Sequence, residues 1–310
     1  MISVSQLSKY YSAKPPVVAL DNINLEIEEG ELFGLIGPDG AGKTTLFRIL
    51  TTLMVPDLGK ATVMGWDVVN DYDKIRKHIG YMPGRFSLYQ DLSVIENLEF
   101  YATLFNTTIE ENYHLIKPIY EQIAPFKDRR AGALSGGMKQ KLALSCALIH
   151  KPKVLFLDEP TTGVDVVSRK EFWQMLEGLK KEGITILVST PYMDEASMCD
   201  RIALIHEGKI LQVAPPHQIA ASSSANLWEV RSEKIYTALQ LLDGYEGIQG
   251  VFPFGDCLHV QLTDPTVDGT FIAAWLQRAG LIDATVKQIQ PGIEDVFLMQ
   301  LSSSQKHQAS

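Results

Sequence analysis

The sequence predicts an α/β fold: a mostly parallel core sheet with an antiparallel β region and a helical region beside it, followed by a small C-terminal α/β domain. Three observations support this prediction. An apolar run over residues 32–36 leads through a glycine-rich loop into a helical run over residues 46–53. Residues 154–157 form a second uninterrupted apolar run, which is typical of a strand buried on both faces of a parallel sheet. After residue 210 the apolar pattern weakens and alternates between strand and helix.

The remaining elements follow from local patterns. Apolar and polar residues alternate from residue 2 to residue 27, which predicts an antiparallel strand pair ahead of the glycine-rich loop. From about residue 71 to residue 130 the pattern is helical, most clearly over residues 95–102. Three serines at 222–224 indicate a linker. Beyond it, strands and helices are expected in the order of a ferredoxin-like domain, at residues 227–230, 235–242, 257–262, 271–276 and 285–289.

The glycine-rich loop is the motif most specific for function. Residues 37–45 read Gly-Pro-Asp-Gly-Ala-Gly-Lys-Thr-Thr and fit the phosphate-loop pattern G-x-x-x-x-G-K-[ST]. Its glycines allow successive backbone N–H groups to turn toward phosphates, Lys43 adds a positive charge, and Thr44 offers a hydroxyl to Mg²⁺. The loop therefore predicts that the chain binds a nucleoside triphosphate, through Gly37, Pro38, Asp39, Gly40, Ala41, Gly42, Lys43, Thr44 and Thr45.

A second glycine motif identifies the class of triphosphatase. Residues 134–140, Leu-Ser-Gly-Gly-Met-Lys-Gln, precede a helical run over residues 142–149, and a helix start of this kind is another anion site. One chain has no need of two such sites for one nucleotide. The sequence therefore resembles the ATP-binding-cassette (ABC) family, in which the L-S-G-G element of one subunit closes over ATP held by another. The resemblance implies a dimer around ATP, with these residues acting in trans: Leu134, Ser135, Gly136, Gly137 and Met138.

Two acidic residues follow the buried run at 154–157. Carboxylates at this position emerge at the carboxyl end of a parallel strand, where such sheets bind ligands. We expect Asp158 to hold Mg²⁺ and Glu159 to accept the proton of the attacking water. Residues 160–165 resemble the family's next loop, which ends at a dimer-contacting acid, here Asp165. Tyr11 occupies the place of the family's adenine-stacking aromatic residue, with Tyr10 as the alternative.

The resemblance covers nearly the whole chain and implies its domain limits. Residues 1–216 would form the ATP-binding domain, with its helical region at about 85–150 docking on a membrane subunit. Residues 217–300 would form the accessory α/β domain, and residues 301–310, which are polar, a disordered tail. Residues 291–298, Pro-Gly-Ile-Glu-Asp-Val-Phe-Leu, resemble the closing motif of drug- and polyketide-exporter ATPases.

Two positions depart from the family in the phosphate-loop site. Gly84 stands where the family usually has a Gln that touches Mg²⁺ or the attacking water, and Pro191 replaces the usual His. Proline has neither a side-chain donor nor a backbone N–H. Losing one such group typically costs ~10²- to 10³-fold in rate, so we expect weak hydrolysis in this site. This pattern resembles the amino-terminal, degenerate cassette of tandem-cassette exporters, and it favours a heterodimer over a homodimer. The alternative is that Tyr192 or Thr190 substitutes through its hydroxyl.

Composition narrows the classes of partner. The 310 residues carry a formal charge of −9 and no basic block, which argues against a nucleic-acid partner. No apolar run approaches the ~20 residues of a membrane helix, and the first residues lack the form of a signal peptide. We therefore expect a cytoplasmic chain, held at the inner face of the cell membrane by permease subunits. The three cysteines follow no metal-ligand spacing and are expected to be buried or idle thiols.

Three functions remain open at this point. The favoured one is the ATPase subunit of an ABC exporter, with ATP and Mg²⁺ as cofactors and membrane permease subunits and a second ABC ATPase subunit as partners. A regulatory nucleotide-binding subunit with little turnover is the second, supported by Gly84 and Pro191 but opposed by Glu159. A soluble ABC ATPase acting on DNA or ribosomes is the third, which the acidic charge disfavours.

Overall fold

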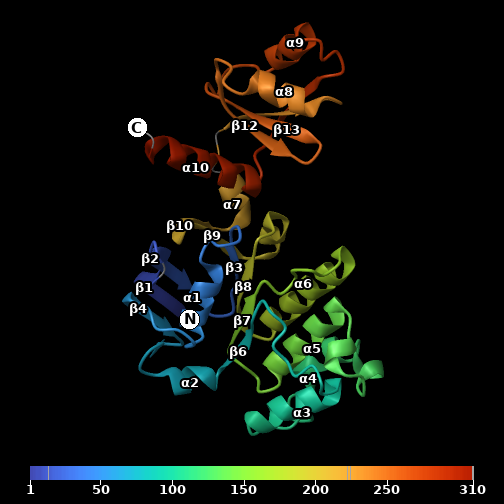
Figure 1. Ribbon diagram of the computed structural model, residues 1–310. Helices are drawn as coiled ribbons and strands as arrows, with labels where there is room; N and C mark the ends of the chain where they lie inside the picture. The colour runs from blue at the N-terminus through green and yellow to red at the C-terminus, as the bar shows by residue number, and fades with distance from the viewer. Residues whose placement is uncertain (13, 222, 224, 309–310) are drawn as a thin grey trace. The chain divides into compact units, whose positions relative to one another are not determined.

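Figure 1 shows the computed structural model of the chain, which describes all residues except 13, 222, 224, 309 and 310. The chain divides into two compact units, Met1–Ala214 and Pro215–Ser310, two residues before the predicted boundary. Two of the three serines of the predicted linker, at 222 and 224, lie outside the described residues. No helix in the described part of the chain is long and apolar enough to cross a membrane.

A six-stranded sheet forms the centre of the first unit. The order of its strands is β10-β9-β3-β8-β7-β6, and every neighbouring pair is parallel except β10 with β9. The strands are β3 (Leu32–Ile36), β6 (Ile79–Met82), β7 (Val154–Asp158), β8 (Thr185–Thr190), β9 (Arg201–His206) and β10 (Lys209–Ala214). Every residue of β3, β7 and β8 is buried, as expected for strands covered on both faces. The mostly parallel core sheet is therefore confirmed.

A second, antiparallel sheet has the order β2-β1-β4-β5. Its strands are β1 (Ile2–Tyr11), β2 (Val17–Ile27), β4 (Leu58–Val63) and β5 (Trp66–Asp67). The predicted opening pair is confirmed, because β1 and β2 pair antiparallel in a register that starts at Ile2 opposite Ile27. Helix α1 (Lys43–Leu50) lies between this sheet and the central sheet, and its Phe47 meets Phe156 of β7 edge to face. This shared core fixes the start of α1 beside the ends of the central strands.

The helices of residues 94–181 lie on the opposite side of the central sheet, whereas the short helix of residues 72–76 contacts β5 and β6. Figure 1 shows α5 and α6 on the side of the strands away from α1. The α-helices are α2 (Tyr72–Arg76), α3 (Val94–Leu104), α4 (Tyr113–Tyr120), α5 (Gly136–Leu148) and α6 (Val166–Lys181), and the short 3₁₀ segments are Ala124–Phe126, Ala131–Ala133 and Met193–Met198. The helical prediction for residues 71–130 is wrong at Ile79–Met82, which is the edge strand β6. A four-residue apolar run does not show whether its period is that of a strand or of a helix.

The second unit contains a four-stranded antiparallel sheet of order β12-β13-β11-β14. Its elements are α7 (Pro216–Ala221), β11 (Asn226–Arg231), α8 (Ile235–Leu242), β12 (Ile248–Phe254), β13 (Cys257–Leu262), α9 (Phe271–Arg278), β14 (Thr285–Ile289) and α10 (Ile293–Gln308). This order is the split β-α-β arrangement, so the ferredoxin-like prediction is confirmed. Strand β12 was not predicted, because Gly250 and Pro253 weaken its pattern; as an edge strand it tolerates both.

The expectation of a disordered tail over residues 301–310 is wrong as far as Gln308. Helix α10 begins at Ile293 and continues to Gln308, and residues 309 and 310 lie outside the described residues. A helix that is already nucleated lengthens at the cost of fixing one residue for each hydrogen bond, so a polar extension can remain helical.

Candidate nucleotide-binding site

The predicted site residues gather because four neighbouring strands end at one edge of the central sheet. In the order β3-β8-β7-β6, these strands lead into the phosphate loop, Pro191, Asp158 with Glu159, and Gly84. The register aligns the ends, since Ile36 pairs with Thr190 and Asp158 with Ser189. Segments more than a hundred residues apart in sequence are thus brought side by side at the carboxyl ends of parallel strands, where such sheets bind ligands.

The phosphate loop joins β3 to α1 in the predicted strand, loop, helix order. Gly42 is the N-cap of α1 with φ of 105°, and a Cβ at this position would lie 2.5 Å from the backbone oxygen of Ala19. Only glycine fits both the left-handed backbone and this close approach. The α1 N-terminus therefore stands open toward the strand ends, with its unpaired N–H groups and positive dipole available to an anion.

Lys43 is positioned by the loop itself. Its ammonium nitrogen donates to the carbonyl oxygens of Gly37 at 2.8 Å and Pro38 at 3.0 Å, and it forms an ion pair with Glu159 Oε1 at 3.1 Å. The Lys43 side chain is only 3 % exposed, whereas that of Glu159 is 23 % exposed. The charges of the phosphate loop and of the predicted catalytic acid are therefore in direct contact.

Glu159 has a backbone conformation that is uncommon for a residue with a side chain, with φ of 51°. Its backbone N–H is held by the carbonyl oxygen of Ser189 at 3.1 Å and by the Ser189 hydroxyl at 3.0 Å. Strained conformations of this kind persist where the surroundings fix them, and they cluster at active sites. Strand β8 thus fixes the direction in which Glu159 leaves the end of β7.

Asp158 is buried, and its Oδ1 accepts a hydrogen bond from the Ser189 hydroxyl at 2.7 Å. A carboxylate with one oxygen held and further lone pairs free, together with the half-buried Thr44 hydroxyl, is a hard oxygen donor set of the type that Mg²⁺ prefers. The two predicted metal ligands therefore fit the ion chemically. Burial and the charge of Asp158 raise the pKa of nearby Tyr81 to about 12, so its phenol stays protonated.

Gly84 lies against the same carboxylate. A Cβ at residue 84 would be 3.1 Å from the backbone oxygen of Asp158 and 3.9 Å from its Oδ2. The position where the family carries Gln is thus directly beside the predicted metal ligand, and here it offers no side chain.

The segment after β8 is organised by a buried carboxylate, Glu195. Its Oε2 accepts from the hydroxyls of Thr190 at 2.5 Å and Thr161 at 3.0 Å, and its Oε1 accepts from Arg169 Nε at 3.0 Å. The Thr190 hydroxyl also accepts from the Tyr192 backbone N–H at 3.1 Å. The single donor of the Thr190 hydroxyl is therefore used inside the protein, and one of its lone pairs accepts from the residue after Pro191.

Tyr11 reaches the phosphate loop from β1. Its hydroxyl lies 3.3 Å from Thr45 Oγ1, and its side chain is partly exposed. Tyr10, the alternative, donates its backbone N–H to Asp57 at 2.7 Å, and no hydrogen bond joins its side chain to the loop among the described residues. Tyr11 is therefore the tyrosine of this pair that borders the predicted site.

The structure keeps the L-S-G-G motif apart from the phosphate loop. Ser135 is the N-cap of α5 and accepts from the Met138 N–H at 3.4 Å, on the side of the sheet away from α1 (Figure 1). Here the motif contacts the start of α6, since a Cβ at Gly137 would lie 3.0 Å from the Ser168 hydroxyl. Asp165, the N-cap of α6, accepts from the Ser168 N–H at 3.0 Å, and this bond lowers its pKa. The motif and Asp165 thus form a second cluster.

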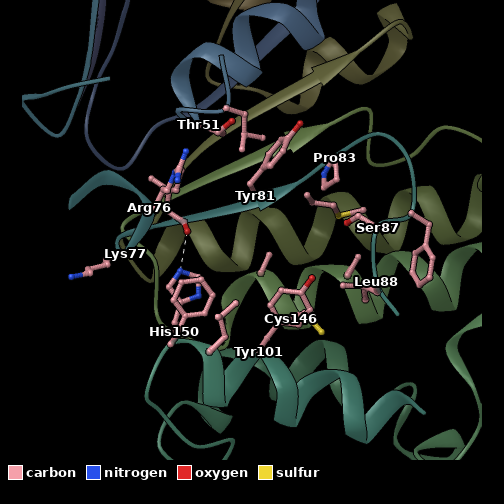
Figure 2. Close-up of a pocket in the computed structure, with 18 of the residues that line it drawn as sticks. Thr51, Arg76, Lys77, Tyr81, Pro83, Ser87, Leu88, Tyr101, Cys146 and His150 are labelled. Atoms are coloured by element: carbon pink, nitrogen blue, oxygen red, sulfur yellow. Dashed lines mark hydrogen bonds between the residues drawn. The ribbon is translucent and has the colours of Figure 1, made fainter. Parts of the chain in front are cut away.

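A pocket of about 470 Å³ adjoins the Gly84 loop. Figure 2 shows Thr51 and Tyr81 at the top of it, Ser87 and Leu88 at the right, and Tyr101 below. Pro83 and Arg85, the two neighbours of Gly84, also line this pocket. In the short loop after β6, Gly84 therefore lies against Asp158, and the two residues that flank Gly84 line the pocket.

Sequence reasoning missed Ser189 and Glu195. Ser189 ends a buried apolar strand, and a hydroxyl in that place is a signal that could have been used. Glu195 sits in a polar run with no such signal, and its role depends on contacts from β8, α6 and the loop after β7.

Comparison with known proteins gives a consistent result. The family model described as "ABC transporter" matches residues 20–162. The chain is 47 % identical over 220 residues to the probable multidrug ABC transporter ATP-binding protein YbhF of Escherichia coli (strain K12), which covers 70 % of this chain but only 38 % of YbhF. It is 33 % identical over 285 residues to the Nod factor export ATP-binding protein I of Rhizobium sp. (strain N33), covering 91 % of each.

A solved structure shares the fold of the first unit. The dimeric, post-hydrolysis ATP-binding cassette MJ0796 bound to ADP and Pi covers 69 % of this chain and 98 % of its own, with 27 % identity and a TM-score of 0.64.

Proposed function

The chain belongs to the ABC transporter ATP-binding protein family, and on this premise we propose that it is the ATP-hydrolysing subunit of an exporter. The observation that supports this function best is the convergence of Lys43, Asp158 and Glu159 at the open start of α1. This arrangement offers a positive charge and helix N–H groups to phosphates and a carboxylate to the attacking water. The name of the Nod factor export protein supports export as the direction of transport.

The roles of the residues follow from their positions. The phosphate loop would bind the β- and γ-phosphates of ATP, with Lys43 leaving Glu159 for the γ-phosphate. Glu159 would then be free to accept a proton from water. Thr44 and Asp158 would hold Mg²⁺, which neutralises charge on the phosphates. Tyr11, partly exposed beside Thr45, would stack on adenine.

A second subunit would complete each site. Because the L-S-G-G motif and Asp165 form a cluster away from the chain's own phosphate loop, they would serve the ATP of a partner. The surface beside Asp165 supports this assignment, since Val166 and Val167 are 79 % and 69 % exposed at the start of α6. Adjacent exposed apolar side chains of this kind favour a protein interface. The dimeric state of MJ0796 agrees with it.

The chain's own site would hydrolyse ATP weakly. Gly84 offers no side chain beside Asp158, and Pro191 offers no donor. Substitution by Thr190 is disfavoured because its hydroxyl donates to Glu195 and accepts from the Tyr192 N–H. A partner ATPase subunit with a complete site would then supply most of the turnover, so a heterodimer is favoured over a homodimer.

The pocket in Figure 2 would receive the permease. Apolar and basic side chains line it together, and its wall includes the loop that carries Gly84. A permease segment seated there could move this loop relative to Asp158, which would couple the membrane subunit to the nucleotide. This contact would place the chain at the cytoplasmic face of the membrane.

The test is steady-state ATP hydrolysis by the purified chain, alone and mixed with a second ABC ATPase from the same operon. We expect slow turnover alone, fast turnover in the mixture, and little effect of Glu159→Gln on the mixture. Fast turnover alone that Glu159→Gln abolishes would instead mark an ordinary homodimeric motor. ATP binding with slow turnover in both samples would favour the regulatory subunit.

A further inference from the structure

Three different metal-binding side chains meet on one face of the sheet in the second unit. Glu229 of β11 pairs directly with His259 of β13, and Cys257 lies two residues from His259 on the same face. One ligand atom from each residue lies within 4.8 Å of the other two. The opposite face of these strands carries the apolar core, which includes Val230, Leu258 and Val260. The three polar residues therefore have no part in that core.

His259 is held in one orientation by two contacts. Its Nδ1 hydrogen-bonds to Oδ1 of the buried Asp295 at 2.6 Å, and its ring stacks on Phe254 at 4.1 Å with an interplanar angle of 8°. Asp295 is fixed in turn, since its Oδ2 accepts from the Gly292 N–H at 2.8 Å. A carboxylate bound to one ring nitrogen orients the ring and makes its other nitrogen more basic, the arrangement usual for metal-bound histidines.

The cluster is open to solvent at Glu229, which forms an ion pair with Arg231. Cys257, His259 and Asp295 are buried, whereas the Glu229 side chain is 24 % exposed. Arg231 donates to both carboxylate oxygens of Glu229, at 2.9 Å and 3.1 Å, and to Asp256 at 2.6 Å. The Glu229 oxygens retain further lone pairs beside those that accept from Arg231. The Cys257 thiol donates to the Phe254 carbonyl oxygen at 3.1 Å.

We propose that Glu229, Cys257 and His259 bind a divalent metal ion of the zinc class, with His259 using Nε2 and Asp295 positioning the ring. Sulfur, imidazole and carboxylate ligands in one site select zinc over magnesium or calcium. Binding would convert the Cys257 thiol to a thiolate, with its proton released to solvent as the metal–sulfur bond forms. Three protein ligands leave one tetrahedral position for water or another donor. The site lies wholly in the second unit and does not depend on the nucleotide function.

The test is cobalt(II) titration of the full chain, without a histidine tag and under reducing, oxygen-free conditions. We expect one Co²⁺ per chain, a thiolate-to-cobalt charge-transfer band, and loss of that band on adding Zn²⁺. Cys257→Ser should abolish the band. Asp295→Asn, a positioning change, should weaken binding by roughly 10- to 100-fold while leaving the band intact at saturation. Cys199→Ala, which removes a buried thiol of the first unit, is the matched control and should change nothing.

A second measurement keeps the test decisive if Cys257→Ser does not fold. Peptide mass spectrometry monitors the alkylation of the wild-type thiols with and without Zn²⁺. Zn²⁺ should slow the modification of Cys257 alone. Cys146 and Cys199 are the internal references. The proposal is overturned by Co²⁺ spectra without a charge-transfer band, by a band that survives Cys257→Ser, or by equal Cys257 alkylation rates with and without Zn²⁺.

Discussion

Single residues determine whether the candidate site can turn over. Gly84 and Pro191 stand at the ends of two of the four strands that form the site, next to the strand that carries Asp158 and Glu159. Neither has a side chain that can donate a hydrogen bond, whereas Lys43, Asp158 and Glu159 are in place. Under the proposed function, the groups that would bind ATP are therefore intact, and the groups that would act on the attacking water or the γ-phosphate are incomplete.

Restoring the two family residues should raise the rate. We expect Gly84→Gln with Pro191→His to increase ATP turnover by the chain alone by about 10²-fold or more, because each change adds one positioned group. A Cβ at residue 84 must move a few tenths of an ångström from the Asp158 oxygen, which the exposed loop can accommodate. Steady-state phosphate release measures this. Gly84→Ala with Pro191→Ala changes the same two positions without adding a side-chain donor and should give little gain. Equal turnover in both double variants would contradict the role of these positions.

His150 should make stability depend on pH. Its ring stacks on Phe105 at 3.8 Å, its Nε2 lies 2.9 Å from the Ile79 carbonyl oxygen, and its buried Nδ1 has no partner among the described residues. Burial lowers the pKa of His150, with the charge of His78 a smaller cause. Protonation would bury an unpaired charge.

The sign follows from proton binding. Between the lowered folded pKa and about 6.5, the unfolded chain binds more protons, so stability that is present above pH ~6.5 is lost as the pH falls through the folded pKa. The loss has a maximum slope of about 1.4 kcal/mol per pH unit. The free energy of unfolding, measured with urea at neutral and mildly acidic pH, should fall less on acidification in His150→Gln than in the wild type. The Gln amide can still donate to the Ile79 carbonyl. Equal losses in wild type and variant would show that other groups carry the pH dependence.

At the scale of elements, the two helix starts of the second cluster form the surface that would meet a partner. Helices α5 and α6 begin at Ser135 and Asp165, each of which caps its helix with a side-chain oxygen. The two starts pack together at Gly137 and Ser168. The exposed valines that follow Asp165 cover no part of the chain's own core, so their apolar surface is available to a second subunit.

A charge on this surface should weaken ATP-dependent dimerisation without unfolding the chain. We expect Val167→Asp to change stability by no more than about 0.5 kcal/mol, because the side chain is exposed, and to reduce the ATP-induced dimer fraction of an Glu159→Gln background. Size-exclusion chromatography with light scattering measures the dimer. Val69→Asp changes an exposed valine in an earlier, distant part of the sequence. It is the control and should dimerise normally. Unchanged dimerisation of Val167→Asp would remove α6 from the interface.

The elements also show what the sequence could predict. The phosphate loop, the L-S-G-G motif and Asp158 with Glu159 are contiguous in sequence, so their residue types alone identify them. Two edge strands were missed: β6 has too few residues to reveal its period, and Gly250 and Pro253 weaken the pattern of β12. Ser189, Glu195 and the cluster of Glu229 with His259 were also missed, because their contacts depend on strand order and register.

At the scale of the whole molecule, each of the two units has a hydrophobic cluster of its own among the described residues. One is built on the strands of the first unit and α1, and the other on β11, β13, α8 and α9. The candidate ATP site belongs to the first unit and the proposed metal site to the second. Each ligand should therefore stabilise only the unit that contains its site.

Calorimetry should separate the two cores. A ligand that binds only the folded state stabilises it by RT ln(1 + [L]/Kd), about 2.7 kcal/mol at a hundredfold excess over Kd. We expect two thermal transitions, because two-state behaviour fails when domains unfold independently. Mg²⁺-ATP should raise the midpoint temperature of only one transition, and Zn²⁺ that of only the other. Lys43→Ala should remove the ATP shift and leave the Zn²⁺ shift, and Cys257→Ser should do the reverse. A single transition raised by both ligands would mean that the two cores unfold as one cooperative unit.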